Sequence, residues 1–327
     1  MHAFERGRGE ITAFKSFSCG RMAETKKMIE VERSCAPGLM VTKEEENDKA
    51  VKRSRMTAIV KELIIYPIKS CSGIRVDEAI TTEYGLALPS NVLLSDRRWM
   101  IIKNGKHQTQ TQISKMATIQ PEFVPDGLLL KAPNMPNLAI SVNPPPTEII
   151  EFKCYDVSIN GRKYGENVSQ WLSTYLGKQN LHLVYFDNQF QCRLSKDMEP
   201  EIPTEARETD LLAYQDISPL LLCSIESVQD LNKRLEKPVK DYWRVMTIGG
   251  AKMTWIRPCL RCLMTTINQK TGERDRDYEP WKTLRSYRLK PEMYGKEPQF
   301  GIYVAPDEYG LMRLGDEIKI SVENQNF

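Results

Sequence analysis

The segment RPCLRCLMTTIN, residues 257–268, holds the side chains whose spacing most suggests chemistry. Cys259 and Cys262 are separated by two residues, as in half of a zinc site or in a redox-active dithiol. Structural zinc needs four ligands, and the sequence has no second CxxC pair and no HxxxH pair. A thioredoxin-like dithiol is followed by a helix, whereas the β-branched, alternating residues 263–268 predict a strand. Both interpretations are therefore disfavoured.

A single functional thiol, with the other cysteine structural, is the remaining chemical interpretation of this loop. Arg261 places a positive charge beside Cys262, which favours the thiolate form, and Pro258 stiffens the loop. A thiolate on a rigid loop is a soft ligand for copper(I), an iron–sulfur cluster or another thiophilic metal. The spacing is equally compatible with two buried, inert cysteines. The residues of the loop leave both possibilities open.

Composition and charge narrow the class of protein. The chain has 327 residues, 41% of them hydrophobic, which suits one large or two medium domains with a buried core. The net charge of +3 comes from residues 1–56, so the remainder is neutral and lacks the basic face that nucleic acid binding requires. Eight scattered cysteines and only three histidines disfavour a disulfide scaffold, histidine-rich metal sites and Ser–His triads. No apolar run approaches the length of a membrane span.

The elements that must position the loop are mostly short strands. Residues 1–56 contain the charge run TKEEENDKAVKRSR and are expected to form a disordered tail. Helices are predicted for 165–177, ending at Gly177, and for 223–238, with Ser224 as a cap, and Asn160-Gly161 predicts a hairpin turn. The class is mostly β with several helices (α+β), and the short, closely spaced strands suggest a small antiparallel barrel or meander. Strands are predicted for 56–70, 73–81, 97–103, 116–123, 127–132, 137–142, 147–153, 155–160, 243–250, 251–256, 263–268, 300–306 and 316–322.

Seven short motifs occur in an order that resembles one protein family. Together they resemble the MOSC-domain proteins of the mitochondrial amidoxime-reducing-component type, over about residues 57–325. The resemblance implies a MOSC N-terminal β-barrel domain at 57–177 and a MOSC domain at 178–327, both rich in strands. The motifs are IIYPIKSC (64–71), SDRRW (95–99), YQDISPLLLCS (214–224), RPCLRCLMTTIN (257–268), TLRSYR (283–288), FGIYV (300–304) and LGDEI (314–318).

The resemblance also implies a cofactor and its main contacts. Cys262 matches the cysteine whose thiolate ligates the metal of the molybdenum cofactor, Mo-molybdopterin. Lys69, Ser70 and Arg97 match residues that contact the cofactor in the family. A cofactor phosphate would give these side chains a physical role, because arginine offers a forked donor and lysine a point charge. Without a cofactor, Lys69 reads as a solvated side chain after a strand.

Three further residues match motifs close to the cofactor in the family. Asp216 and Ser218 belong to the YQDISP element, and Tyr303 belongs to FGIYV. The resemblance implies that Ser218 contributes to cofactor binding and makes Asp216 and Tyr303 candidates, beside Cys262, for the catalytic residues. Each also has a structural reading, since Ser218 and Asp216 can stabilise turns and Tyr303 can belong to the core.

The sequence departs from the family at two points. Family members place an FRPN(I/V) stretch, whose arginine and asparagine hold the cofactor, between the LN.RLE helix and the strand before the cysteine loop. Here LNKRLEKPVK runs directly into DYWRVMTIGG, and Arg244 does not match that pattern. Ile217 stands where the family often has a small hydroxyl residue. The resemblance therefore implies fewer charge-assisted hydrogen bonds to the cofactor than in other members.

The function implied by the resemblance is molybdenum-dependent reduction of N-hydroxylated compounds such as amidoximes and hydroxylamines. A haem b5-type protein and its flavin reductase would supply the electrons, in mitochondria as for the family, and otherwise in the cytoplasm. No nucleic acid partner is expected. One alternative is a cofactor carrier or sulfur-handling MOSC protein without turnover. Another is a non-catalytic splice or gene-model form that lacks the FRPN-type segment.

Overall fold

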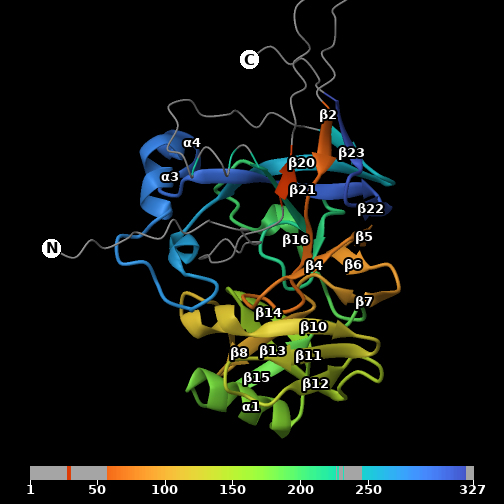
Figure 1. The fold of residues 1–327 in the computed structure, drawn as a ribbon, viewed down its shortest axis with the longest axis vertical. Helices are drawn as coiled ribbons and strands as arrows, with labels where there is room; N and C mark the ends of the chain where they lie inside the picture. Colours follow the sequence, from red (N-terminus) through yellow and green to blue (C-terminus); the bar gives the residue numbers. More distant parts are fainter. Residues whose placement is uncertain (1–27, 31–56, 226, 228–230, 232–244, 322–327) are drawn as a thin grey trace, which may run out of the picture.

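A computed structural model describes residues 28–30, 57–225, 227, 231 and 245–321, and the structural statements below concern these residues. Two closed β-barrels lie one above the other along the long axis of the molecule, with smaller sheets between and beside them (Figure 1). The described helices lie outside the barrels, and α1 (Glu166–Leu176) and α3 (Trp281–Arg288) each bury apolar side chains in the core clusters that they share with strands. The predicted class, mostly β with several helices, is confirmed.

The upper barrel in Figure 1 combines strands from distant parts of the chain. Its core is apolar and includes Leu222, Met246, Met253 and Ile318, all buried. The pairing of the two longest strands is interrupted by register shifts close to Pro258, where proline cannot donate to the ladder. In order around the barrel the strands are β1 (Met28–Glu30), β18 (Leu220–Ser224), β21 (Gln299–Glu308), β20 (Ala251–Leu260), β19 (Val245–Ile248), β23 (Glu317–Ser321) and β2 (Thr57–Val60).

The lower barrel carries helix α1 (Glu166–Leu176) on its outer side (Figure 1). Trp171 and Leu172 are buried on one face of this helix, and Gly177 ends it with φ +65°. The predicted helix and its glycine stop are thus confirmed. The barrel strands are β13 (Glu148–Cys154), β14 (Val157–Lys163), β15 (Leu181–Tyr185), β8 (Trp99–Lys103) and β9 (Lys106–His107).

The smaller elements connect and flank the barrels. Helices α3 (Trp281–Arg288) and α4 (Pro291–Tyr294) lie beside the upper barrel (Figure 1). No helix in the described part of the chain is long and apolar enough to cross a membrane. The remaining strands are β10 (Gln120–Val124), β11 (Gly127–Lys131), β12 (Leu138–Ser141); β22 (Leu311–Arg313), β5 (Glu78–Thr82), β6 (Gly85–Leu88), β7 (Asn91–Ser95); β3 (Leu63–Ile65), β4 (Ile74–Val76); β16 (Arg193–Leu194) and β17 (Leu211–Leu212).

Strands from the two ends of the described chain pair directly. β2 is hydrogen-bonded to β23, and β5 is hydrogen-bonded to β22. The expected division into 57–177 and 178–327 stays a prediction. Of the expected tail, 1–56, only β1 is described, and the rest lies outside the described residues, as does most of 226–244.

Two predicted strands begin as short 3-10 helices instead. Residues Leu263–Thr266, directly after Cys262, and Ser114–Thr118 form single turns, so a strand over 263–268 was wrong and the strand at 116–123 starts only at Gln120. In each turn a threonine hydroxyl donates to the carbonyl three residues before it: Thr266 to Leu263 at 2.6 Å and Thr118 to Lys115 at 2.8 Å. These local hydrogen bonds override the β preference of the branched side chains.

The predicted hairpin turn at Asn160-Gly161 was also wrong. The register pairs Cys154 with Val157, so Tyr155 and Asp156 form the turn, and Gly161 lies within β14. Gly161 has a packing role there, because a Cβ atom would lie 2.6 Å from the Tyr214 hydroxyl oxygen. At the predicted second helix, Ser224 Oγ accepts the N–H of Ser227 at 3.1 Å, as expected of a cap.

Candidate functional site

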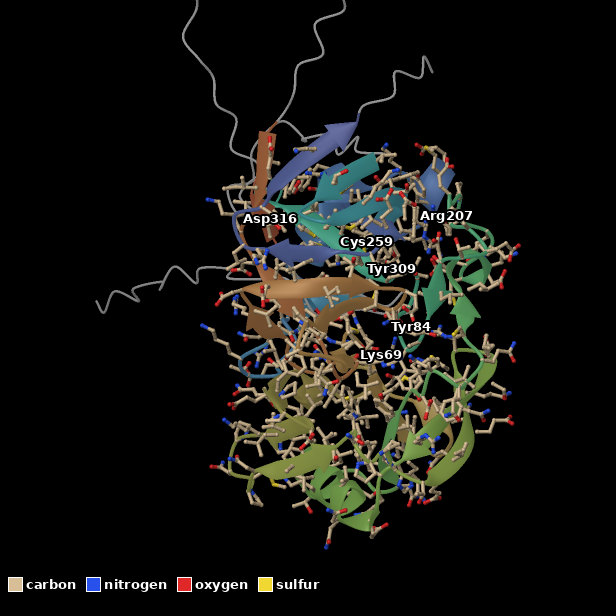
Figure 2. All side chains as sticks on the ribbon, turned by 90° about the vertical axis from the view of Figure 1, so that its right-hand side faces the viewer. Lys69, Tyr84, Arg207, Cys259, Tyr309 and Asp316 are labelled. Atoms are coloured by element: carbon tan, nitrogen blue, oxygen red, sulfur yellow. The ribbon has the colours of Figure 1, made fainter. Side chains whose placement is uncertain are left out.

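A buried ion pair joins two of the predicted site residues between the barrels. Lys69 follows β3 and is held by its main-chain N–H, which donates to the Trp99 carbonyl at 2.8 Å. Its ammonium donates to the Tyr214 carbonyl at 2.8 Å and to Asp216 Oδ1, and both charged side chains are only 2% exposed. Figure 2 shows Lys69 at the level where the two barrels meet. The structure thus brings together motifs that lie about 150 residues apart in the chain.

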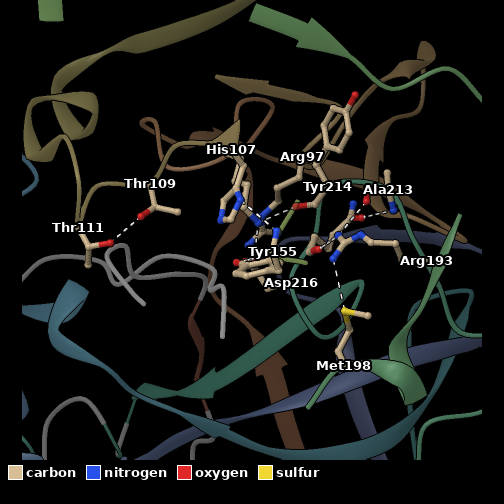
Figure 3. A network of polar contacts seen from close by, with 12 residues as sticks. Arg97, His107, Thr109, Thr111, Tyr155, Arg193, Met198, Ala213, Tyr214 and Asp216 are labelled. Atoms are coloured by element: carbon tan, nitrogen blue, oxygen red, sulfur yellow. Dashed lines mark hydrogen bonds and ion pairs between the residues drawn. The ribbon is translucent and has the colours of Figure 1, made fainter. Parts of the chain in front are cut away.

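The charge of Lys69 depends on its carboxylate partner. Burial lowers the pKa of Lys69, Asp216 opposes this by stabilising the ammonium, and the nearby Arg193 guanidinium lowers the pKa further. Tyr155 adds a third side chain, since its hydroxyl also donates to Asp216 Oδ1 and its ring lies 5.6 Å from the Lys69 ammonium. Figure 3 shows Tyr155 and Asp216 within one polar network that also includes His107 and Arg193. Removal of Asp216 would leave an uncompensated buried charge.

Arg97 is linked to this pair through its neighbour Asp96. Its guanidinium forms an ion pair with Asp96 and lies 5.7 Å from the ring of Tyr66, and its backbone has φ +49°. The Asp96 carbonyl accepts the Gln215 side-chain amide at 2.7 Å, directly beside Asp216 in the chain. The predicted residue Arg97 is therefore buried within the same polar region, with its charge balanced by a carboxylate.

Ser70 is connected to the segment that follows the cysteine loop. Its backbone has φ +64°, and its carbonyl accepts the Gln110 amide at 2.9 Å. Gln110 and Gln269 exchange hydrogen bonds of 3.2 and 3.0 Å between their side-chain amides. Gln269 lies three residues after the 3-10 turn that begins beyond Cys262. The amide pair therefore fixes the Ser70 loop against the cysteine loop.

Cys262 occupies the junction between β20 and the following 3-10 turn. It is 8% exposed, and its carbonyl accepts the Thr265 N–H at 3.3 Å and the Thr265 hydroxyl at 3.1 Å. Its side chain belongs to an apolar cluster with Ile217, Cys259 and Tyr303. None of the six cysteines in the described residues forms a disulfide. The structure therefore places a thiol from one motif in the same apolar cluster as residues of two others.

The other cysteine of the pair is held as a neutral thiol. Burial raises the pKa of Cys259, and this outweighs the opposing effects of Arg261, the hydrogen bond with Tyr303 and Arg257. Arg261 is fully buried, and its guanidinium donates to the Phe300 carbonyl at 2.6 Å and to the Cys223 sulfur at 3.5 Å. The sequence-based interpretation of one structural cysteine therefore suits Cys259, which is fully buried in the same cluster as Tyr303 and lies at the level of the upper barrel (Figure 2).

Tyr303 and Ser218 are both tied to strand β21. Burial raises the pKa of Tyr303 well above its usual value, and its hydroxyl is hydrogen-bonded to Cys259, so it stays protonated at neutral pH. Ser218 Oγ donates to the Val304 carbonyl at 2.7 Å and lies 3.1 Å from the Leu220 carbonyl. In this structure the Ser218 hydroxyl therefore fixes the main chain of its own loop. Its role in cofactor binding stays a prediction.

Sequence reasoning missed the buried arginines around the site. Arg193 donates to the main chain on both sides of Tyr214, and Arg257 donates to Glu199 at 2.6 Å. Some buried nitrogens, Nε of Arg193 and Nε and Nη1 of Arg257, have no hydrogen-bond partner in the described residues. Arg257 begins the segment RPCLRCLMTTIN, but nothing in that pattern indicates that its side chain is buried, and no motif contains Arg193.

The buried charges fit an anionic ligand. Among the described residues six buried cations outnumber three buried carboxylates, and the partly exposed Glu199 pairs with one of the cations, Arg257. The remaining excess of buried positive charge is costly unless something negative compensates it. A phosphorylated pterin that carries a thiolate-bound metal meets both requirements of this region, the positive charge and the soft sulfur donor. The buried cations are Lys69, Arg97, Arg98, Arg193, Arg257 and Arg261, and the carboxylates are Asp96, Asp210 and Asp216.

Comparison with known proteins places the chain in a family. Residues 57–179 match the MOSC N-terminal beta barrel domain and residues 236–319 match the MOSC domain. The chain is 35% identical to mitochondrial amidoxime-reducing component 1 of Mus musculus over 291 residues, 82% of this chain and 83% of that protein. The chain belongs to the family of the mitochondrial amidoxime-reducing components.

Other members of the amidoxime-reducing components show similar relationships. Component 2 of Bos taurus is 33% identical over 296 residues, which cover 82% of this chain and 84% of that protein. Component 1 of Homo sapiens is 34% identical over 284 residues, which cover 79% and 82%. The resemblance inferred from the seven motifs is thus confirmed. The departure before the cysteine loop falls at 232–244, outside the described residues.

Proposed function

We propose that this protein is a molybdenum-cofactor-dependent enzyme that reductively removes oxygen from N-hydroxylated substrates. The observation that carries the proposal is the buried Lys69–Asp216 pair with Arg193 close to it, in a protein whose Cys262 shares an apolar cluster with Ile217, the neighbour of Asp216 in the chain. The names of the relatives, amidoxime-reducing components, support the reaction class. Amidoximes and hydroxylamines are the proposed substrates.

The chain's own residues would hold the cofactor as follows. Cys262 would supply the thiolate to the metal, and Lys69, Arg97 and Ser70 would bind the anionic group of the pterin, with Ser218 fixing the adjacent loop. When bound, the molybdenum cofactor supplies the two-electron chemistry that breaks an N–O bond. The reduction also consumes two protons. Tyr303, which is protonated at neutral pH, and Asp216, which as a carboxylate paired with Lys69 would first have to take up a proton, are the proposed groups to deliver them.

The protein surroundings would orient the substrate and exclude water. The Cys262 loop is fixed by Thr265 and by the amide pair of Gln110 and Gln269, so the ligand is presented on rigid backbone. Burial of Asp216 and Tyr303 strengthens every electrostatic interaction in this region, because the local dielectric is low. We propose that residues 57–177 and 178–327 form the two domains that meet at this site.

Partners and location follow from the same proposal. Electrons would come from a haem b5-type protein and its flavin reductase, and the enzyme would act in mitochondria, since the relatives are named mitochondrial. Neither nucleic acid nor a further macromolecular substrate is required. These assignments are tested most directly by turnover with purified b5-type donors.

A second candidate is a cofactor carrier or sulfur-handling protein without turnover, or a non-catalytic form. Two observations favour it: the sequence lacks the family's FRPN-type stretch, and Ile217 replaces a small hydroxyl residue with a buried apolar side chain. Each change would remove polar contacts to the cofactor. A carrier would bind molybdenum and release it intact, whereas the enzyme would reduce benzamidoxime in the presence of a b5-type donor.

The decisive experiment compares two cysteine substitutions in the purified full chain. Cys262→Ser is expected to reduce bound molybdenum at least tenfold and to abolish benzamidoxime reduction, because a serine hydroxyl is a hard, protonated donor. Cys192→Ser is the matched control, since Cys192 lies 3.0 Å from the Tyr84 hydroxyl, a contact that serine can keep. Metal analysis by mass spectrometry gives the readout. Equal molybdenum in the two variants would remove Cys262 from the ligand role.

A further inference from the structure

Tyr155 occupies a turn position that its residue type disfavours. It forms, with Asp156, the two-residue turn between β13 and β14, and its backbone has φ +59°. Such turns favour Asn, Asp or Gly, and a bulky aromatic residue in the left-handed region is strained. Strain of this kind persists only where the surroundings impose it, and it is concentrated at functional sites. The position therefore requires an explanation beyond the turn itself.

The side chain of Tyr155 turns inward to the buried ion pair. Its hydroxyl donates to Asp216 Oδ1, the same oxygen that accepts the Lys69 ammonium. Its ring centroid lies 5.6 Å from the Lys69 nitrogen, within the range of a cation–π interaction. Figure 3 shows the Tyr155 side chain directed toward Asp216. A half-buried tyrosine thus covers both members of the pair at once.

His107, on strand β9, holds this turn from outside the hairpin. Its Nδ1 accepts the main-chain N–H of Tyr155 at 3.1 Å, and the two rings lie 4.4 Å apart. A second hydrogen bond joins the imidazole to the main chain of Lys153, on the other side of the turn. Burial, with the charge of Lys69, lowers the pKa of His107 to about 4, so Nδ1 can accept at neutral pH. Both hydrogen bonds from His107 to the main chain of this turn are therefore present at neutral pH.

We propose that Tyr155, held in its strained turn by His107, is a positioning residue that fixes Asp216 against Lys69 and so presents the Lys69 ammonium to the anion bound at this site. The inference rests on the proposed function for the identity of that anion, the cofactor's phosphate. The contacts themselves come from three separate elements: the β13–β14 turn, strand β9 and the loop before β18. Contacts from several separate elements are what fix a charged side chain, here Lys69, in one position.

The test uses the charge of Lys69 as its readout. The groups that act on Lys69 are Asp216, Cys154 and Arg193, with Tyr155 against its side chain and His107 behind Tyr155. In Tyr155→Phe the carboxylate loses one donor and its fixed orientation, so the pKa of Lys69 falls further. A lysine whose folded pKa lies below its unfolded pKa makes stability rise with pH between the two values. That rise is expected to begin about one pH unit lower in Tyr155→Phe.

Thermal unfolding from pH 7 to 11 measures this shift on the purified full chain and needs neither turnover nor metal. Tyr164→Phe is the control, because Tyr164 is a buried tyrosine of the same barrel whose hydroxyl donates to the Ser141 carbonyl. Parallel profiles for the two variants would overturn the proposal. The same proteins are dialysed at each pH, and the molybdenum that they retain is measured. As the pH is raised, Tyr155→Phe is expected to lose its molybdenum at a lower pH than Tyr164→Phe does.

Two substitutions of His107 decide the outcome should Tyr155→Phe fail to fold. His107→Asn keeps a side-chain acceptor for the Tyr155 N–H and is expected to give the same unfolding profile from pH 7 to 11 as the unmodified protein. His107→Ala removes it and is expected to reproduce the shift. Equal unfolding profiles for His107→Asn and His107→Ala would refute the claim that the hydrogen bond to His107 holds Tyr155 in place. A shifted unfolding profile in a protein that binds no molybdenum would uphold the positioning role and reject the proposed function.

Discussion

At the scale of single residues, buried charge is the dominant feature of this site. Lys69 is almost fully buried and is compensated by one carboxylate, while Tyr155 and the Tyr214 carbonyl complete its surroundings. Desolvation of both charges is expensive, and their attraction offsets that cost only while both are present. Loss of one partner is therefore worse than loss of both.

The ion pair gives a prediction that a double-mutant cycle can check. Asp216→Asn is expected to lower the free energy of unfolding by about 3–5 kcal/mol, because it leaves the Lys69 ammonium buried without a counter-charge. Lys69→Met combined with Asp216→Asn is expected to recover more than half of that loss. Urea unfolding at pH 7 measures each corner of the cycle. Additive losses would mean that the two side chains do not interact energetically.

His107 gives a prediction for acidic conditions. Its pKa is lowered to about 4 from an ordinary value of 6.5, first by burial and then by Lys69. The unfolded chain therefore binds more protons between these values, and stability falls as pH decreases from 6.5 to 4. Protonation of His107 is expected to lower the free energy of unfolding by about 3 kcal/mol at pH 4 and to have no effect above pH 6.5.

His107→Asn is expected to remove this part of the acid dependence while keeping the acceptor for Tyr155. Denaturant unfolding at pH 7 and pH 4.5 gives the comparison, with His182→Asn as the control for the other described histidine. A loss of the same size in the unmodified protein and in His107→Asn would show that other groups cause it.

At the scale of elements, the helical apolar spacing predicted α1 correctly, whereas local hydrogen bonds in one case and a contact from a distant strand in another caused the misses. Helix α1 agrees with its apolar spacing and glycine stop, because its face packs on a barrel in the usual way. Residues 263–266 form a 3-10 turn because the Thr265 and Thr266 hydroxyls bond carbonyls three residues back. The hairpin turn lies at Tyr155 because contacts from β9 impose it. Neither cause is visible in a propensity pattern.

Gly161 gives a prediction at this scale. Gly161→Ala places a Cβ atom 2.6 Å from the Tyr214 hydroxyl oxygen and 2.9 Å from Val184 Cβ, so β14 or Tyr214 must shift. The free energy of unfolding is expected to fall by about 1–3 kcal/mol. Gly165→Ala is the matched control, since its nearest contact there is 3.4 Å, and it is expected to change stability much less. Equal effects in urea titrations would mean that the close approach at Gly161 is easily relieved.

At the scale of the whole molecule, the site exists because strands far apart in sequence meet between two barrels. Short, closely spaced strands predicted a small antiparallel barrel or meander, and the motifs predicted Lys69, Asp216 and Cys262 as members of one site. The direct Lys69–Asp216 contact, the Tyr155 cover and the buried arginines could not be predicted, since they depend on which distant strands pair. Pairing of this kind is a property of the complete fold.

The pairing of β2 with β23 and of β5 with β22 has a consequence for biosynthesis. During translation β2 and β5 leave the ribosome long before β23 and β22 have been synthesised. Until then, the backbone hydrogen-bonding groups on the edges that will pair with β23 and β22 are unpaired. Open edges attract other nascent chains, and a chaperone that shields them until translation reaches β23 would raise the yield of the native barrel. The upper barrel therefore closes last and only after nearly the whole described chain has been made.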